Sequence, residues 1–431
     1  MMSKPILIIS YYWPPSGGSG VQRWLYFSKY LKKLGYSPII LTINPTSASY
    51  PSIDESLLKE AVGIPVFQVK AFNWIKIYSW IRYGFKNSIK APQGEFIKKG
   101  ILDHLASFIR GTFFIPDARI SWVKPAIEKA IQLINDNRID KIITTGPPHS
   151  THLIGLKLKS ILKVKWIADF RDPWSDLFYL KSFYRFPFAK KKDLKLERNV
   201  LSNADAVLTT TSNNFHKYLE SRINKKQNFY KIYNGYDSEL YSNIVKKTNN
   251  VFSIVFTGLL TNNHPYKSIV KSFSELQKNY SEIKFKVIFA GSISDDIIKE
   301  FKNAISDFEY CGYVEHASAV KLMFKADILL NFLFDNQKRS SMISGKLIEY
   351  MATGNPILMI GDSKSEAAKL LSNQSYNLTV NPGQIKKINS FIKNKYENWI
   401  EGKINKPEYK PILPFSREQT TKSLIKVLEN I

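Results

Sequence analysis

A short run in the second half of the chain combines hydroxyls, glycine, lysine and glutamate at helical spacing. Ser344, Gly345 and Lys346 lie at the start of a predicted two-turn helix, and Glu349 lies one turn further in. The unpaired N–H groups of a helix N-terminus attract anions, so Ser344 and Gly345 can hold a diphosphate that Lys346 neutralises. A carboxylate at Glu349 can accept hydrogen bonds from two vicinal ribose hydroxyls. Taken alone, a glutamate such as Glu349 is most often a residue of a solvated helix face.

A glycine-rich loop near the N-terminus is a second candidate for contact with a phosphate. Gly17 and Gly18 lie in the segment Pro14–Gly20, between an apolar strand-like run and an amphipathic helix. Glycine allows the backbone to approach a ligand closely, at a helix N-terminus that favours anions. The spacing is not GxGxxG, and no acidic residue suits a dinucleotide ribose about 20 residues later, which excludes an NAD site. The alternative is an ordinary tight turn.

Two further polar segments follow predicted strands in the first half of the chain. Asp169, Arg171 and Asp172 stand at the end of one strand, where a catalytic or acceptor-binding group would lie. An ion pair that closes the turn is the alternative. His149 and His152 follow another strand; His149 is the better candidate because it lies on the loop, whereas His152 falls inside the helix that begins near Ser150.

These candidates are spaced along a regular alternation of short apolar runs and longer helical patterns. Such alternation is typical of βαβ units and parallel sheets. The predicted strands are Ile6–Ser10, Pro38–Thr42, Lys141–Thr145, Lys165–Asp169, Ala206–Thr210, Tyr230–Tyr233, Phe252–Thr257, Phe285–Ala290, Phe308–Tyr310, Ile328–Phe332 and Pro356–Ile360.

The series restarts after residues 241–250, a polar and basic stretch that suits a linker. We therefore predict two doubly wound, Rossmann-like α/β domains that face each other across a cleft. The predicted N-terminal domain is residues 1–240 and the predicted C-terminal domain is residues 251–415. In such sheets ligands bind beyond the carboxyl ends of the strands.

The composition restricts the class of protein and of partner. The chain has 431 residues, 44% of them hydrophobic, a formal net charge of +26 and one cysteine, Cys311. An internal disulfide is therefore impossible, and no apolar run is long enough for a signal peptide or a membrane span. We expect a cytoplasmic protein whose excess charge attracts an anionic membrane, nucleic acid or a phosphorylated small molecule.

The run around Glu349 resembles the donor-binding segment of GT-B glycosyltransferases of family 4, also called group 1. The family has a helix with a central glutamate, followed by Ala-x-Gly-x-Pro and a strand; Glu349, Ala352, Gly354 and Pro356 match it. Similar segments occur in the family's order along nearly the whole chain. They are Tyr11–Pro15 with the glycine loop, Phe114–Arg119 with Trp122, Gly146–Ser150, Asp169–Trp174, Asn203–Val207, Tyr233–Asp237, Phe256–Gly258 and Ala326–Asp327.

The resemblance implies a retaining hexosyltransferase that moves a sugar from a nucleotide-diphosphate donor to a glycan or polyprenyl-linked acceptor. The pathway would be cell-surface polysaccharide biosynthesis, making lipopolysaccharide, capsule or exopolysaccharide. It also implies that the terminal helix, residues 416–431, crosses back to the first domain. Positive groups and N–H dipoles must stabilise the leaving diphosphate. The implied donor-binding residues are Gly17, Gly18, Gly258, Lys267, Ser344, Gly345, Lys346 and Glu349.

The implied catalytic candidates are Asp172, Asp169 and His149, any of which could orient the acceptor hydroxyl or the reacting sugar. The chain has no Asp-x-Asp motif, so we expect no essential metal and no cofactor besides the donor substrate. Three positions depart from the family's pattern. Ser341 replaces its first glutamate, Leu259 replaces the arginine after Gly258, and Arg171 replaces a frequent histidine.

Two stretches of the sequence combine basic and aromatic residues and account for part of the positive net charge. Residues 71–110 hold seven Lys or Arg against two acids, with eight interleaved aromatics, and residues 181–198 contain Lys190, Lys191 and Lys192. Such stretches suit an anionic membrane surface, so we expect peripheral contact with the inner face of the plasma membrane. A solvated face over an ordinary core is the alternative.

Three competing functions remain compatible with the sequence. A nucleotide-sugar epimerase can share this fold and needs no acceptor. A non-catalytic protein of the same pathway is compatible with the departures at Ser341 and Leu259. Charge and aromatics alone suggest a nucleic-acid-binding protein, but no RNP signature, zinc spacing or helix-turn-helix context supports it, and we expect no nucleic-acid partner.

Overall fold

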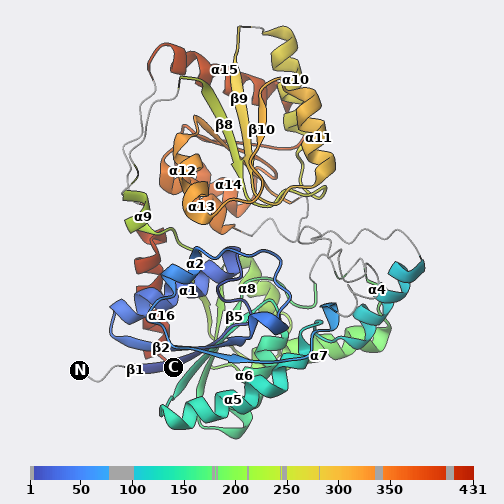
Figure 1. Ribbon diagram of the computed structural model, residues 1–431, viewed down its shortest axis with the longest axis vertical. Helices are drawn as coiled ribbons and strands as arrows, with labels where there is room; N and C mark the ends of the chain where they lie inside the picture. The colour runs from blue at the N-terminus through green and yellow to red at the C-terminus, as the bar shows by residue number, and fades with distance from the viewer. Residues whose placement is uncertain are drawn as a thin grey trace. The chain divides into compact units, whose positions relative to one another are not determined.

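The computed structural model describes residues 4–76, 101–176, 180, 183–210, 213–242, 244, 250–280, 282–334, 343–403 and 412–431. The chain divides into two compact units, Met1–Tyr233 with Glu418–Ile431, and Asn234–Arg417. Each unit contains a parallel sheet between layers of helices (Figure 1). The predicted architecture of two doubly wound α/β sheets is therefore confirmed.

The first unit is built on a seven-stranded parallel sheet with the order β3-β2-β1-β4-β5-β6-β7 within the described residues. Its strands are β1 (Lys4–Ile9), β2 (Tyr36–Ile43), β3 (Val66–Val69), β4 (Lys141–Gly146), β5 (Lys165–Phe170), β6 (Ala206–Thr209) and β7 (Phe229–Lys231). Its helices are α1 (Ser19–Lys33), α2 (Leu57–Glu60), α4 (Ile101–Phe113), α5 (Val123–Asp136), α6 (Ser150–Ile161), α7 (Pro187–Asn203), α8 (Asn213–Glu220) and α16 (Arg417–Glu429).

Period-two alternation along β1 explains why this sheet is covered on both faces. Leu7 and Ile9 belong to the core under α5, α6 and α7, whereas Ile6 and Ile8 belong to the core under α1 and α16. Figure 1 shows these two helical layers on opposite sides of the strands. Because every strand residue of β1 after Pro5 is buried, the strand is apolar throughout, as parallel strands usually are.

The second unit repeats this plan on a six-stranded parallel sheet with the order β10-β9-β8-β11-β12-β13, again among the residues described. Its strands are β8 (Phe252–Thr257), β9 (Phe285–Ala290), β10 (Phe308–Tyr310), β11 (Ile328–Phe332), β12 (Ile357–Ile360) and β13 (Leu378–Val380). Its helices are α9 (Ser238–Ser242), α10 (Lys267–Asn279), α11 (Asp295–Ala304), α12 (His316–Lys325), α13 (Gly345–Thr353), α14 (Glu366–Leu371) and α15 (Ile385–Ile400).

The chain passes between the units at two points that lie side by side in the second unit. Tyr236 pairs with Ser416 in a parallel bridge, the N–H of Tyr236 donates to the carbonyl of Phe415, and the N–H of Arg417 donates to the carbonyl of Tyr236. The division falls after Tyr233, ahead of the basic stretch 241–250, because the ring of Tyr241 is buried against Phe324 of α12.

The terminal helix α16 contributes apolar side chains to the first unit. Leu424, Val427 and Leu428 are buried in the same core as Ile6 and Trp24. The helix therefore returns to the first unit as the sequence predicts. Across the stretches of chain that the structure describes, no helix is both long and apolar enough to span a membrane.

Candidate functional site

The start of α13 in the second unit brings together the polar run that the sequence singled out. The side chain of Ser344 caps the helix, since its Oγ accepts a hydrogen bond of 3.2 Å from the N–H of Leu347. The first amides of the helix, at Gly345 and Lys346, have no acceptor within the helix. Gly354 ends α13 in the left-handed conformation, with φ of 71°. This geometry is that of an anion-binding helix N-terminus.

Lys346 is a half-buried cation beside the ring of Phe256. Its Nζ lies 4.1 Å from the ring centroid, and no carboxylate of the described residues lies within ion-pairing distance. Burial lowers the pKa of Lys346 to about 7. An anion bound next to this side chain would restore its charge, so the position favours a negatively charged ligand over an empty site.

The wall beside Lys346 is formed by backbone that requires glycine. Gly258 has φ of 114°, and a Cβ placed there would lie 3.3 Å from Cδ of Lys346. Gly291, at the end of the neighbouring strand β9, has φ of 127°, and its Cβ would lie 2.1 Å from the carbonyl oxygen of Gly258. Gly258 was a predicted site residue and lies next to Lys346; Gly291 supports it and was not predicted.

Glu349 is buried, with 8% of its surface exposed, and does not lie on a solvated face. Its Oε1 lies 2.7 Å from Nε2 of His316 and 3.6 Å from Nη2 of Arg417. Burial alone would raise the pKa of Glu349, but His316 and Arg417 outweigh this effect and hold it below its usual value. The carboxylate is therefore ionised and fixed in orientation.

His316 and Arg417 are functional candidates that the sequence reasoning missed. His316 opens α12, and Arg417 opens α16, the terminal helix that was predicted only to cross back to the first domain. Arg417 Nε also donates to the carbonyl of Gly235. Neither residue stands near Glu349 in sequence, so no local spacing could have linked them to it.

Lys267 is the remaining predicted donor-binding residue of this unit, and within the described residues it does not contact the others. It is exposed at the first position of α10 and forms no ion pair or hydrogen bond with Lys346 or Glu349 in the structure as described. His264, in the loop before α10, is buried, and its Nδ1 accepts a hydrogen bond of 3.0 Å from the N–H of Thr261. Ser341 falls outside the described residues.

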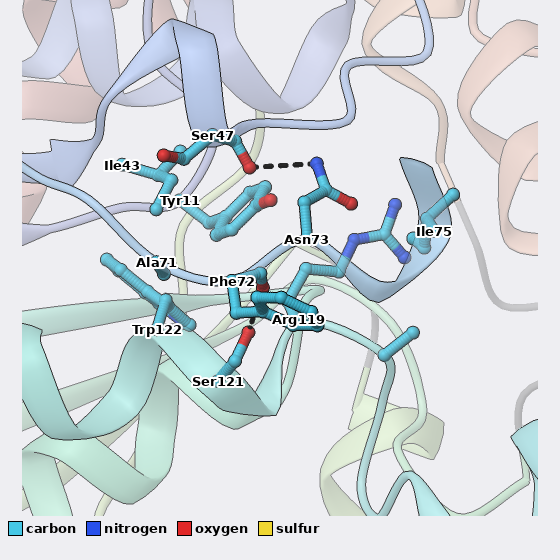
Figure 2. Close-up of a pocket in the computed structure, with 11 residues that line it drawn as sticks. Tyr11, Ile43, Ser47, Ala71, Phe72, Asn73, Ile75, Arg119, Ser121 and Trp122 are labelled. Atoms are coloured by element: carbon cyan, nitrogen blue, oxygen red, sulfur yellow. Dashed lines mark hydrogen bonds between the residues drawn. The ribbon is translucent and has the colours of Figure 1, made fainter. Parts of the chain in front are cut away.

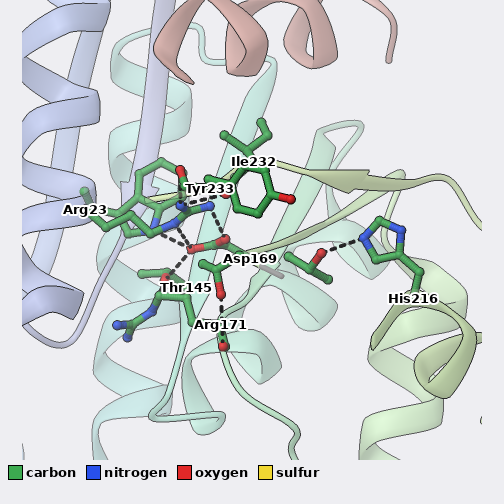
Figure 3. Close-up of polar contacts among 10 residues, drawn as sticks. Arg23, Thr145, Asp169, Arg171, His216, Ile232 and Tyr233 are labelled. Atoms are coloured by element: carbon green, nitrogen blue, oxygen red, sulfur yellow. Dashed lines mark hydrogen bonds and ion pairs between the residues drawn. The ribbon is translucent and has the colours of Figure 1, made fainter. Parts of the chain in front are cut away.

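Asp169, at the end of β5 in the first unit, is fully buried in a network of donors. Its carboxylate accepts from Arg23 Nε and Nη2 at 3.2 and 3.0 Å, from Trp24 Nε1 at 2.7 Å and from Thr145 Oγ1 at 2.9 Å. Arg23 Nη1 in turn donates to the carbonyl of Ile232 at 3.0 Å (Figure 3). The carboxylate therefore ties α1 to β4, β5 and the end of β7. In the structure Asp169 thus acts as a positioning group, and its predicted contact with the acceptor or the reacting sugar stays a prediction.

Arg171 and Asp172 follow Asp169 at the carboxyl end of β5. Arg171 Nε donates to Thr145 Oγ1 at 3.2 Å and its Nη2 donates to the carbonyl of Pro147 at 2.7 Å. A Cβ on Gly20, at the start of α1, would lie 2.0 Å from Arg171 Nη1, so that glycine makes room for the guanidinium. Burial lowers the pKa of Arg171. Asp172 is half-buried beside this fixed cation and remains a catalytic candidate.

His149 is buried under the loop that was expected to expose it. Its ring is stacked on Trp174 at 5.0 Å, and His152 is stacked on Phe170 at 4.6 Å. Burial pushes the pKa of His149 well below its usual value and that of His152 to about 3. Both rings are therefore neutral and serve as packing at the base of the loop. The ring of His149 is covered in this packing, and its predicted contact with a substrate stays a prediction.

The two glycines predicted to contact a phosphate, Gly17 and Gly18, have different surroundings in the structure. Gly17 is buried, and its N–H donates to the carbonyl of Ser52 at 3.0 Å, so this amide is already used within the protein. Gly18 is exposed, caps α1 with φ of 101°, and has no atom within 4 Å of where a Cβ would stand. Of the two, Gly18 has the open surroundings that a ligand needs.

A pocket of the first unit lies beyond the ends of β1 and β2, next to the start of α5 (Figure 2). Tyr11, Phe72 and Trp122 supply aromatic walls, and the guanidinium of Arg119 lines the same space. Asn73 fixes one rim through a hydrogen bond of 2.8 Å to the carbonyl of Ser47. Burial raises the pKa of Tyr11 to about 12, so its hydroxyl stays protonated. The pocket, hereafter the first-unit pocket, combines flat apolar surface with one cation.

No group of three or more potential metal ligands from His, Cys, Asp and Glu occurs among the residues described.

No protein-family model matches the chain, and no curated protein matches its sequence. Solved structures are similar over its whole length. The sucrose-phosphate synthase of Thermosynechococcus elongatus matches with a TM-score of 0.61 and 13% identity, covering 99% of this chain and 98% of its own. The lipopolysaccharide outer core galactosyltransferase WaaB, in its apo form, matches with a TM-score of 0.55 and 13% identity, covering 99% and 100%.

A third similar structure contains a nucleotide sugar. It is described as trehalose-6-phosphate from E. coli bound with UDP-2-fluoro glucose, and it matches with a TM-score of 0.60 and 11% identity over 99% of both chains. At these identities the likeness concerns the fold. The chain has the GT-B fold, and the solved structures that it resembles include glycosyltransferases.

Proposed function

We propose that this protein is a retaining glycosyltransferase of family 4 that transfers a hexosyl group from a nucleotide-diphosphate sugar. The arrangement of Lys346 and Glu349 on one helix supports the proposal most directly. A cation with a lowered pKa and an ionised, oriented carboxylate stand one turn apart on α13. A nucleoside diphosphate carries the matching groups, a charged diphosphate and a ribose with two neighbouring hydroxyls.

In this mechanism the second unit stabilises the leaving group. The bond from the anomeric carbon to the diphosphate oxygen breaks, and the electron pair leaves with the diphosphate. Lys346, together with the first amides of α13, stabilises the charge that develops there. Glu349 accepts the ribose hydroxyls, while His316 and Arg417 keep its carboxylate in place. Gly258 leaves space for the diphosphate next to Lys346.

The first unit would receive the acceptor. A hydroxyl of the acceptor forms the new bond to the anomeric carbon on the face that the diphosphate leaves, and its proton passes to the departing phosphate oxygen. Asp172 is our candidate for orienting this hydroxyl. Beside the first-unit pocket, the exposed ring of Phe72 can pack against the apolar face of an acceptor sugar, and Arg119 can hold an anionic substituent.

We propose a glycan or a polyprenyl-linked glycan as the acceptor, within the assembly of a cell-surface polysaccharide. Of the neighbours described above, WaaB is a galactosyltransferase of the lipopolysaccharide outer core, which is one such assembly. The strongly basic composition is compatible with an anionic, lipid-linked substrate.

Calorimetric titration with UDP-, GDP-, ADP-, dTDP- and CMP-sugars tests the donor half of this proposal. We expect one nucleotide to bind the wild-type protein and to lose at least tenfold in affinity in Glu349→Ala. Glu275→Ala, a carboxylate change on α10 of the same unit, serves as the matched control and should bind the donor normally. Thermal unfolding of each variant shows whether a loss of affinity reflects a loss of fold.

Product analysis separates the competing functions. Incubation of the bound nucleotide sugar with membrane-lipid and glycan extracts should give a glycosylated acceptor, and NMR of the new linkage should show the donor's anomeric configuration. An isomeric sugar nucleotide, formed without any acceptor, would instead identify an epimerase. If every member of the panel fails to bind, the donor half of this proposal fails for the isolated protein. A non-catalytic member of such a pathway, or a donor site that forms only with acceptor or membrane present, then becomes the better account.

A further inference from the structure

The end of α4 and the start of α7 form an exposed surface of large apolar side chains in the first unit. Figure 1 shows the two helices together at one side of this unit. Phe113 is 66% exposed and Phe188 is 56% exposed, values unusual for phenylalanine. The basic aromatic surface, as we call it, comprises Ile109, Phe113, Tyr184, Phe186, Phe188, Lys190, Lys191, Lys192, Lys195 and Arg198.

These side chains are held in place by contacts beneath them. Arg185 donates to the carbonyl of Gly111 at 3.0 Å and to the carboxylate of Asp193 at 2.7 Å, which fixes the segment before α7 against α4. The ring of Phe186 lies 5.2 Å from that of Phe108 and 5.9 Å from that of Phe188. The exposed rings therefore belong to a defined surface that folding does not bury.

The charges on this surface have a single sign. In residues 183–200 the two acids, Asp193 and Glu197, are both buried, and they bind Arg185 and Ser175 respectively. The exposed charged residues of the same segment are Lys190, Lys191, Lys192, Lys195 and Arg198. Phe188 and three of these bases, Lys191, Lys192 and Lys195, recur every three or four residues and so share one helical face.

The helix itself gains nothing from this distribution of charge. Lysines near a helix N-terminus oppose the helix dipole, and the first turn of α7 contains no acid. A folded chain without a partner would be more stable with acids there. The start of α7 therefore presents exposed positive charge with no acidic side chain in its first turn.

We propose that the basic aromatic surface docks the protein on an anionic lipid bilayer. Aromatic and aliphatic side chains enter the headgroup region, while the surrounding lysines contact anionic phosphates, as in other interfacial helices. Ile109 and the clustered rings of Phe186 and Phe188 suit a fluid apolar layer better than they suit stacking on single bases. This proposal depends on the surface alone and not on the donor chemistry proposed above.

Co-flotation of the full chain with vesicles tests this surface. The vesicles are phosphatidylcholine with about one third phosphatidylglycerol, compared with phosphatidylcholine alone. We expect binding to the anionic vesicles only. Each lysine near such a surface contributes roughly fivefold to partitioning, so Lys191→Glu with Lys192→Glu should weaken binding about 25-fold or more.

The matched control is the pair Lys386→Glu with Lys387→Glu. These lysines are also adjacent, exposed and near a helix start, that of α15, and the variant has the same net charge. It should bind vesicles nearly as the wild type does. Phe186→Ser with Phe188→Ser should leave weak binding that disappears in 0.5 M salt, because the apolar contribution is lost and charge attraction is screened.

Three results would overturn the proposal. The first is absence of binding to anionic vesicles, and the second is an equal loss in both lysine pairs, which would indicate charge without a defined surface. The third is tighter binding of DNA or RNA duplexes than of vesicles at one ionic strength, with the same dependence on Lys191 and Lys192. None of these assays contains a nucleotide sugar, so their outcome is independent of the donor titration.

Discussion

The two units differ in the partners that the protein gives to a charged side chain withdrawn from solvent. In the first unit, Asp169 meets donors from Arg23, Trp24 and Thr145, which use both carboxylate oxygens. In the second unit, Lys346 meets the face of Phe256 and no acid of the residues described. One charge is fully satisfied by the protein, and the other is not.

This difference separates structural from ligand-binding positions. A buried ion pair with satisfied hydrogen bonds costs little to keep and fixes the elements that it joins. A half-buried cation that contacts an aromatic ring and no counter-ion costs free energy in the unliganded protein, and an anionic ligand recovers that cost on binding. The contrast therefore favours the start of α13 as the place where an anionic ligand binds.

The largest expected effect comes from breaking the satisfied network. Asp169→Asn leaves the guanidinium of Arg23 buried without a counter-charge, which should lower the free energy of unfolding by about 3 kcal/mol or more. Urea denaturation at pH 7 measures this change. Asp172→Asn, the half-buried neighbour three residues later, should lower it by less than about 1 kcal/mol. Equal losses in the two variants would mean that the network has no special structural role.

The opposite result is expected for Lys346. Lys346→Met removes a cation that has no carboxylate partner in the described structure, so the free energy of unfolding should stay the same or rise. Affinity for the nucleotide sugar should fall roughly 10- to 100-fold, since a charge-assisted contact with a phosphate contributes about 1.5–3 kcal/mol. Urea denaturation and calorimetry on the same preparation measure both quantities. A variant that is less stable but keeps its donor affinity would assign Lys346 a structural role and no role in donor binding.

The dependence on pH sharpens the role of Lys346. Its pKa of about 7 in the folded protein lies below that of an unfolded lysine, so between pH 7 and about 10 the unfolded chain binds more protons. The free energy of unfolding therefore rises with pH across that window, by at most about 1.4 kcal/mol per pH unit. Below pH 7 the lysine is protonated in both states, and this group causes no further change.

Donor binding should show the opposite trend, because the diphosphate favours the protonated amine. Affinity should fall as pH rises above 7, with proton uptake on binding at pH 8, detectable as a buffer-dependent heat. Lys346→Arg provides the control, since a guanidinium stays charged and its binding should not vary with pH. Proton uptake that persists in Lys346→Arg would assign the titration to another group.

The smallest predicted effect concerns the orientation of Glu349. His316→Ala removes the hydrogen bond to Oε1, and we expect donor affinity to fall about three- to tenfold. His316→Gln can still donate to the carboxylate and should recover most of the loss. Competition by free nucleoside diphosphate distinguishes positioning of the ribose from any effect on catalysis. If both variants bind like the wild type, Arg417 alone positions Glu349.

The sequence predicted the long buried strands because their apolar runs are continuous, but it missed two short ones. β3 (Val66–Val69) and β13 (Leu378–Val380) are edge strands of their sheets, and neither offers a run of more than a few residues. Strand pairing with a neighbour, which is a tertiary effect, decides such short segments. Gly35 and Gly354 end their helices with positive φ, as their positions in the sequence indicate.

The site was predictable where chemistry is local and not where it depends on distant contacts. Ser344, Lys346 and Glu349 share one helix, so their spacing alone placed them together. The sequence could not show that the carboxylate of Asp169 would bind Arg23, or that the ring of His149 would stack on Trp174. In both cases the partner lies on a different element of the fold. Likewise, Arg417 reaches Glu349 only because α16 begins beside Tyr236.

Calorimetric titration of the nucleotide-sugar panel against wild type and Lys346→Met, at pH 6.5 and pH 8, tests the central claim most directly. We predict that one nucleotide sugar binds the wild type, more tightly at pH 6.5, and that Lys346→Met binds it weakly and equally at both values. Binding that is unchanged in Lys346→Met and independent of pH would contradict the assignment of the diphosphate to the start of α13.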